Sequence, residues 1–197
     1  RDELDVNVQG GQDNSTTALI CACLHGHREI VQLLLQRDEL DVNLQDEDNN
    51  TALICACAYG NTEIVQLLLQ RGELNVNLQD NYYNTALMWA FAEGHTEIVR
   101  LLLQRGELDV NVQDKDNDTV LIWACREGHR EIVQLLLQRE ELNINLQDNY
   151  NKTALICACR NGHREIVHLL LQRKELNVNL QDKYNTTALI SACVEGH

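Results

Sequence analysis

The stretch TALICACAYGNTEIVQLLLQRGELNVNLQDNYYN, residues 51–84, decides the fold because the chain repeats it along its length. Its opening threonine recurs at a constant step of 34 residues, at Thr17, Thr51, Thr85, Thr119, Thr153 and Thr187. The copies that begin at 51 and 153 are identical at 25 of 34 positions. One copy is too small to bury an apolar face alone, whereas stacked copies form a continuous core. The period therefore predicts a solenoid.

Each copy contains two short helical segments followed by an extended excursion. TALICAC begins the first segment, and Thr51 is a residue type that N-caps favour. Gly60 interrupts the pattern, and TEIVQLLLQR then begins a second helix. NVNLQDNYYN is rich in asparagine and aspartate, which favour turns. We therefore expect helix, helix and turn in every copy. The core face of the second helix should carry Ile64, Val65, Leu68 and Leu69.

The repeat boundaries predict a single array over residues 1–197. Full copies occupy 17–50, 51–84, 85–118, 119–152 and 153–186, and partial copies occupy 1–16 and 187–197. Leu189, Ile190 and Cys193 belong to a copy without a second helix of its own, so we expect them to lack cover. This pattern favours a piece of a longer array that has no polar end caps.

The order of helix, helix and finger resembles the ankyrin repeat. The residues that carry the resemblance are the TAL opening, Gly94 with His95, the EIV-x-LLL run, and the Asp-Val-Asn at 109–111. The resemblance covers the whole chain. It implies an all-α, ankyrin-type repeat solenoid with β-turn fingers, and a role as a protein-interaction scaffold.

Two departures separate these copies from the family pattern. The family's Thr-Pro-Leu-His opening is Thr-Ala-Leu-Ile at 51–54, which removes a proline and a histidine. The family's fingertip glycine is replaced in the successive fingers by Asn49, Tyr83, Asn117, Asn151 and Asn185. Asparagine accepts left-handed backbone angles, but tyrosine does so poorly. We therefore expect the tip at Tyr83 to differ from the others.

Composition disfavours several classes of protein. A formal net charge of −14 argues against a nucleic-acid or anionic-membrane partner. No apolar run reaches the roughly 18 residues of a membrane-inserted helix, and the start carries no signal-peptide core. The eight cysteines recur at helical register and not as a disulfide framework. We therefore expect free buried thiols in a reducing compartment, which makes the predicted location intracellular and cytoplasmic.

No pattern in the chain indicates catalytic residues, a cofactor or a metal site. The side chains of a Cys-x-Cys pair such as Cys55 and Cys57 point about 200° apart on a helix and do not chelate one ion. Cys21 and His25 lie one turn apart, but a tetrahedral site needs further ligands. The recurrent Gly-His histidines predict local turn hydrogen bonds, and the recurrent glutamates that open the second helix compensate the helix dipole.

The chain's two tryptophans, Trp89 and Trp123, share one repeat position. A helical wheel at about 100° per residue places Leu19 and Cys23 on the core face and Cys21, which is aligned with the tryptophans, on the opposite face. The ankyrin resemblance implies that this opposite face lines a concave groove beside the fingertips. We therefore predict groove positions for both tryptophans. The thiols aligned with Cys21 should react with a probe faster than the core thiols; they are Cys55 and Cys157.

Most other aromatic residues also fall on the groove and finger side. Tyr59 is aligned with the groove position of His25, and only Phe91 is aligned with the core. The fingertip aromatics are Tyr82, Tyr83, Tyr150 and Tyr184. Tryptophan and tyrosine dominate interface hot spots, and exposed aromatic patches mark contact surfaces. Farther along the predicted groove, Arg126 and Arg160 are candidate partners for an acidic group of a ligand.

These aromatics leave two interpretations open, namely binding of a partner or mere packing of Trp89 on Trp123 and Tyr83 that stiffens the array. We predict binding of a protein or peptide, in an extended form with apolar anchors three residues apart, because the tryptophans should be ~8–10 Å apart. Acidic fingers favour a partner with some basic residues. The alternative function is a structural or spring-like segment of a longer ankyrin array without a dedicated ligand. An engineered, consensus-like scaffold is a third possibility.

Overall fold

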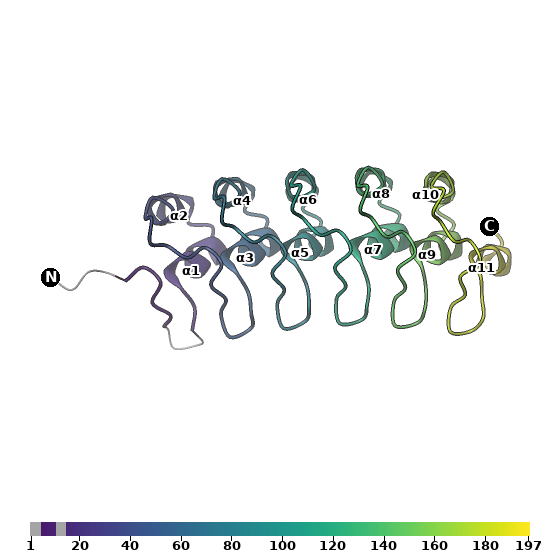
Figure 1. The fold of residues 1–197 in the computed structure, drawn as a ribbon, viewed down its shortest axis with the longest axis horizontal. Coiled ribbons are helices and arrows are strands. Elements are labelled where there is room, and N and C mark those ends of the chain that lie inside the picture. The colour runs from purple at the N-terminus through teal and green to yellow at the C-terminus, as the bar shows by residue number, and fades with distance from the viewer. Residues whose placement is uncertain (1–4, 11–14) are drawn as a thin grey trace. The chain divides into compact units, whose positions relative to one another are not determined.

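The computed structural model describes residues 5–10 and 15–197 (Figure 1). Residues 1–4 and 11–14 belong to the expected partial copy 1–16 and lie outside the described residues. The chain splits into two compact units, Arg1–Leu108 and Asp109–His197, which we call unit 1 and unit 2. The division falls inside the expected copy 85–118, and the single array over 1–197 stays a prediction.

Unit 1 consists of helix pairs joined by long finger loops. The pairs are α1 (Ala18–Leu24) with α2 (Arg28–Leu34), α3 (Ala52–Ala58) with α4 (Thr62–Leu68), and α5 (Ala86–Ala92) with α6 (Thr96–Leu103). The first helices α1, α3 and α5 lie side by side in one layer, and the second helices α2, α4 and α6 form another layer (Figure 1). The fingers project from the first-helix side, away from the second helices (Figure 1).

Unit 2 repeats this arrangement. Its helices are α7 (Val120–Glu127), α8 (Arg130–Leu136), α9 (Ala154–Arg160), α10 (Arg164–Leu170) and α11 (Ala188–Glu195). Isolated bridges close several finger bases, as between Gln79 and Thr85 in unit 1 and between Gln147 and Thr153 in unit 2. The described residues form helices and no strands. The predicted fold class, an all-α repeat solenoid, is confirmed.

Threonine and glycine set the limits of the first helices, as the sequence predicts. The Thr51 hydroxyl accepts a hydrogen bond of 3.1 Å from the backbone N–H of Ile54, and the equivalent threonine caps every other first helix of the described residues in the same way. Such a cap stabilises a helix by about 1 kcal/mol. Gly60 follows α3 with a φ of 71°, a left-handed angle that glycine adopts without steric conflict.

Hydrogen bonds of asparagine side chains connect successive copies within each unit. In unit 1 the Asn43 amide donates to the Glu73 carbonyl at 2.8 Å, and its oxygen accepts from the Asn75 N–H at 2.7 Å. In unit 2 Asn111 makes the same two bonds, to Glu141 and Asn143. We call these bonds the asparagine ladder. They fix the register between neighbouring copies, because each amide satisfies two backbone groups of the next copy.

The first helices are buried on more sides than the helical wheel predicts. Every residue from Ala52 to Cys57 in α3 is buried, because α1 and α5 flank this helix and α4 packs behind it. A wheel with one buried face does not describe a helix that is covered on several sides. The expected exposure of Cys55 and Cys157 is therefore wrong, since they are 7% and 2% exposed, whereas Cys21 is exposed as expected.

Individual positions agree with some expectations and depart from others. Phe91, expected in the core, is only half-buried. The expected difference at the Tyr83 fingertip is wrong, because its φ of 63° matches the 59–60° of the asparagine tips. The Tyr83 N–H donates to the Asp80 carbonyl at 3.0 Å, so the turn holds tyrosine at the same angle. Leu189 and Ile190 in α11 are exposed, as expected.

Thiol labelling distinguishes the observed burial of the cysteines from the burial that the helical wheel predicts. Cys21 and Cys193 are exposed, and the remaining six of the eight cysteines are buried. Burial and the nearby Asp46 charge raise the pKa of Cys55 to about 12, which lowers the reactive thiolate fraction. We expect pulsed iodoacetamide at pH 8, read by peptide mass spectrometry, to modify Cys21 and Cys193 first. Fast modification of Cys55 or Cys157 in the folded protein would contradict the structure.

Candidate binding surface

Trp89 ties helix α5 to the finger that precedes it. The side chain is half-buried, and its indole Nε1 donates to Asp80 Oδ2 at 2.7 Å. The other oxygen of this carboxylate accepts from the backbone N–H groups of Tyr82 and Asn84, at 2.8 and 2.9 Å. Asp80 is only 5% exposed. One buried carboxylate therefore organises the finger and orients the tryptophan ring.

The ring of Trp89 lines a pocket in unit 1. The pocket has a volume of about 430 Å³ and is lined by Leu24, Asn50, Ile54, Cys55, Ala58, Tyr59, Trp89 and Glu93. Tyr59 follows α3 as its C-cap and is 63% exposed. The structure thus brings together two of the predicted binding residues, Trp89 and Tyr59. The fingertip residues Tyr82 and Tyr83 are exposed but do not line this pocket.

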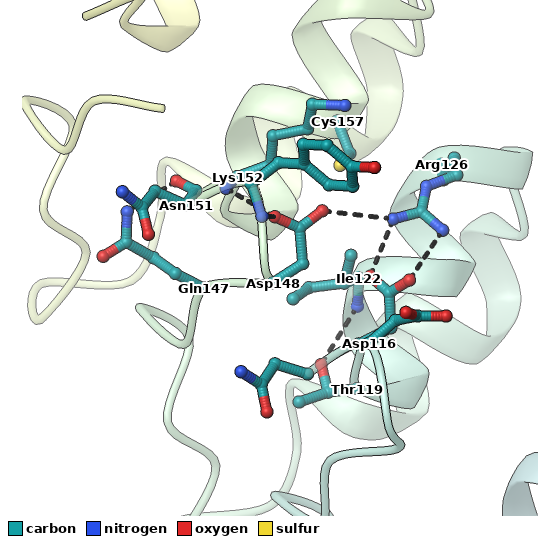
Figure 2. Close-up of polar contacts among 12 residues, drawn as sticks. Asp116, Thr119, Ile122, Arg126, Gln147, Asp148, Asn151, Lys152 and Cys157 are labelled. Carbon is teal, nitrogen blue, oxygen red and sulfur yellow. Dashed lines mark hydrogen bonds and ion pairs between the residues drawn. The ribbon is translucent and has the colours of Figure 1, made fainter. Parts of the chain in front are cut away.

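Arg126 of unit 2 is already engaged with acidic side chains (Figure 2). Its guanidinium donates to both oxygens of Asp118, at 2.7 and 3.0 Å, and its Nη2 lies 3.5 Å from Asp148 Oδ2. Burial alone lowers the pKa of Arg126, but the hydrogen bonds and charge of Asp118 outweigh burial and raise it. These contacts argue against the expected role of Arg126 as a free site for an acidic ligand.

The other predicted residues of unit 2 lie on first helices and fingertips. Trp123 is half-buried in α7, and Arg160 lies at the end of α9, 3.8 Å from Glu195 in an exposed pair. Such a pair stabilises by at most about 1 kcal/mol. Trp89 and Trp123 belong to different units, so their predicted spacing stays a prediction.

Tyr150 belongs to a cation–π cluster on the fingers of unit 2. Lys183 Nζ lies 3.6 Å from the centroid of the Tyr150 ring and 5.2 Å from that of Tyr184. Lys152 Nζ is 5.1 Å from the Tyr150 centroid. The Tyr150 ring is half-exposed. This side chain is therefore a surface aromatic that lysines of its own unit partly cover.

The Gly-His histidines connect copies, which corrects the expectation of purely local turn bonds. His95 Nε2 lies 3.2 Å from the Ala58 carbonyl, and His163 Nε2 lies 3.1 Å from the Arg126 carbonyl. The rings also lie against the left-handed glycines Gly60 and Gly128 of the preceding copies. The joint recurrence of glycine and histidine was visible in the sequence, but their pairing across copies depends on how the copies stack.

A family model described as ankyrin repeats in three copies matches residues 3–80, 39–114, 73–148, 107–182 and 140–197. The chain belongs to the ankyrin repeat family. The TAL opening, the Gly-His turn and the fingers are therefore ankyrin features, and members of this family generally mediate protein–protein interaction.

Solved structures agree with the ankyrin assignment. An ankyrin repeat domain from Acinetobacter baumannii AYE is 29% identical, with a TM-score of 0.79, over 90% of this chain and 91% of that chain. A chain from the complex of a predatory endopeptidase of Bdellovibrio bacteriovorus with an immunity protein is also 29% identical, with a TM-score of 0.74, over 92% of this chain and 93% of that chain. No curated protein sequence matches this chain.

The described part of the ankyrin chain has few features of other functional classes. It contains no helix that is both long and apolar enough to cross a membrane. Residues 5–10 and 15–197 contain no cluster of three or more histidine, cysteine, aspartate or glutamate side chains suited to a metal ion. The ankyrin fold is typically non-catalytic.

Proposed function

We propose that this chain is a non-catalytic scaffold that binds a segment of a partner protein on the surface formed by its first helices and fingers. The unit 1 pocket is the observation that carries the proposal, because it combines an apolar floor with the rings of Tyr59 and Trp89. Its volume of about 430 Å³ falls within the usual range of ligand sites. The Asp80 bond holds the Trp89 ring in place before a ligand arrives.

A peptide selection on the whole chain tests this proposal. We expect Tyr59→Ala and Trp89→Ala each to weaken binding of a selected peptide by about 2 kcal/mol or more, as truncation of a hot spot does. Isothermal titration measures the change. Tyr59→Ala is the cleaner variant because the ring is exposed, whereas Trp89→Ala also removes the indole donor to Asp80. Gln66→Ala on the exposed side of α4 is the control and should leave the affinity unchanged.

A structural role without a dedicated ligand is the second candidate. The asparagine ladder and the Trp89–Asp80 bond favour it, because both stiffen a unit without any partner. Failure of the selection to yield a peptide that depends on Tyr59 or Trp89 would support this structural role. Loss of affinity in Gln66→Ala with normal binding by the Tyr59 and Trp89 variants would reject the proposed surface.

A further inference from the structure

We infer that the unit 1 pocket receives an arginine side chain from a basic segment of the partner. The inference rests on the proposed function and specifies the chemistry of the occupant. Neighbouring helices α3 and α5 place matching pairs of residues around the pocket. Cys55 and Tyr59 lie one turn apart on α3 and its C-cap, and Trp89 and Glu93 lie one turn apart on α5 and its C-cap. Residues four apart share a helix face, and all four of these line the pocket.

The lining is amphipathic in a way that suits a long cationic side chain. Leu24, Ala58 and the buried Cys55 supply apolar surface, the rings of Tyr59 and Trp89 supply aromatic surface, and the exposed Glu93 supplies a carboxylate. An arginine side chain buries its aliphatic stem on apolar surface while keeping its head at the edge. Its planar guanidinium stacks on aromatic rings and pairs with a carboxylate.

Other occupants satisfy the lining less completely. A leucine or methionine anchor fills the apolar part but offers no partner to the Glu93 carboxylate. Displacing water from that carboxylate without replacing its hydrogen bonds is unfavourable. A lysine supplies the charge as a compact, strongly hydrated ammonium and lacks the planar face. The formal net charge of −14 adds a long-range attraction for a basic segment. Charge complementarity and planar stacking together select arginine.

The hydrogen bond from Trp89 to Asp80 strengthens the same argument. A buried carboxylate that accepts the indole N–H polarises the ring toward greater electron density on its face. Cation–π attraction depends on that electron density and is strongest for tryptophan. The bond also fixes the ring in one orientation, so a ligand has less side-chain freedom to remove when it binds.

Small capped amino acids provide a direct test on the whole chain. The probes are N-acetyl-arginine methylamide, the matching lysine compound, and the norleucine compound as the neutral control of similar length. Nuclear magnetic resonance follows the indole N–H signal of Trp89, assigned with the Trp123→Phe variant. We expect the arginine probe to bind severalfold more tightly than the norleucine probe. Glu93→Gln should weaken the arginine probe about threefold, as loss of an exposed ion pair does, and should leave the norleucine probe unchanged.

A second variant separates stacking from apolar contact. Tyr59→Leu keeps apolar surface but removes the aromatic face, so the arginine probe should lose about threefold in affinity while the norleucine probe does not. Equal or tighter binding of norleucine, or an arginine affinity indifferent to both variants, would overturn the inference. If library peptides bind through Tyr59 and Trp89 without enrichment of arginine, the proposed function stands and the arginine inference is wrong.

Discussion

Replacing Asp80 with alanine is expected to lower the free energy of unfolding by about 4 kcal/mol. The carboxylate accepts the backbone N–H groups of Tyr82 and Asn84 and the indole N–H of Trp89, and it is almost completely buried. Alanine leaves these donors without their acceptor, and hydrogen bonds to a charged group are the stronger kind. Urea denaturation followed by circular dichroism measures the loss, and hydrogen exchange at Tyr82 and Asn84 reports it locally.

Two substitutions divide the Asp80 effect into its parts. Asp80→Asn keeps an oxygen for the backbone donors but turns an N–H toward the indole, so we expect about half of the loss. Trp89→Phe removes the indole donor and keeps a ring, and should cost about 1–2 kcal/mol because it leaves a buried carboxylate oxygen without that partner. A loss below about 1 kcal/mol in Asp80→Ala would show that the finger does not depend on this carboxylate.

Replacing Gly60 with alanine should destabilise the chain by about 3 kcal/mol. Its φ of 71° disfavours any Cβ, and a Cβ at this position would lie 2.6 Å from the Cε1 atom of the His95 ring. The ring does not move without loss, because its Nε2 lies 3.2 Å from the Ala58 carbonyl. Chemical denaturation of the purified variant measures the effect.

Gly26→Ala is the matched control. Gly26 has the same φ of 71°, but an added Cβ would lie 3.0 Å from the Oδ1 atom of Asn61, less close than the 2.6 Å contact at Gly60. We expect a loss of about 1 kcal/mol, mainly from backbone strain. The double variant Gly60→Ala, His95→Asn should recover part of the larger loss, since Asn61 occupies the equivalent place against Gly26. Equal losses in Gly60→Ala and Gly26→Ala would mean that the histidine ring moves aside freely.

Sequence was sufficient for the features that depend on local backbone chemistry. The 34-residue period identifies the copies, Thr51 marks a helix start, and Gly60 marks its end, because caps and left-handed angles depend on nearby residues. Helical periodicity also places Tyr59 and Trp89 on the predicted groove face, but a wheel for one helix does not show that the two side chains meet. In the structure they line one pocket, and their role in binding stays a prediction.

Contacts between copies were beyond sequence reasoning. Cys55 is buried because neighbouring helices flank α3, and a wheel drawn for one helix contains no neighbours. Arg126 looked available for a ligand, yet Asp118 from the end of the preceding finger occupies it. Tyr83 adopts the same backbone angle as asparagine because the local turn around Asp80 holds it there. For Cys55 and Arg126, packing against neighbouring copies outweighs the preference of the single residue.

The asparagine ladder has a consequence for how such a gene can change. Because each copy offers the same donors and acceptors to its neighbour, recombination that adds or removes one whole copy within a unit leaves every rung of the ladder with a partner. Length can therefore drift during evolution with little loss of stability. The pocket does not tolerate such a change at its own position, because a copy inserted between those of Tyr59 and Trp89 would separate these two lining residues. Selection for binding would therefore keep the copy with Tyr59 next to the copy with Trp89, while the number of other copies varied.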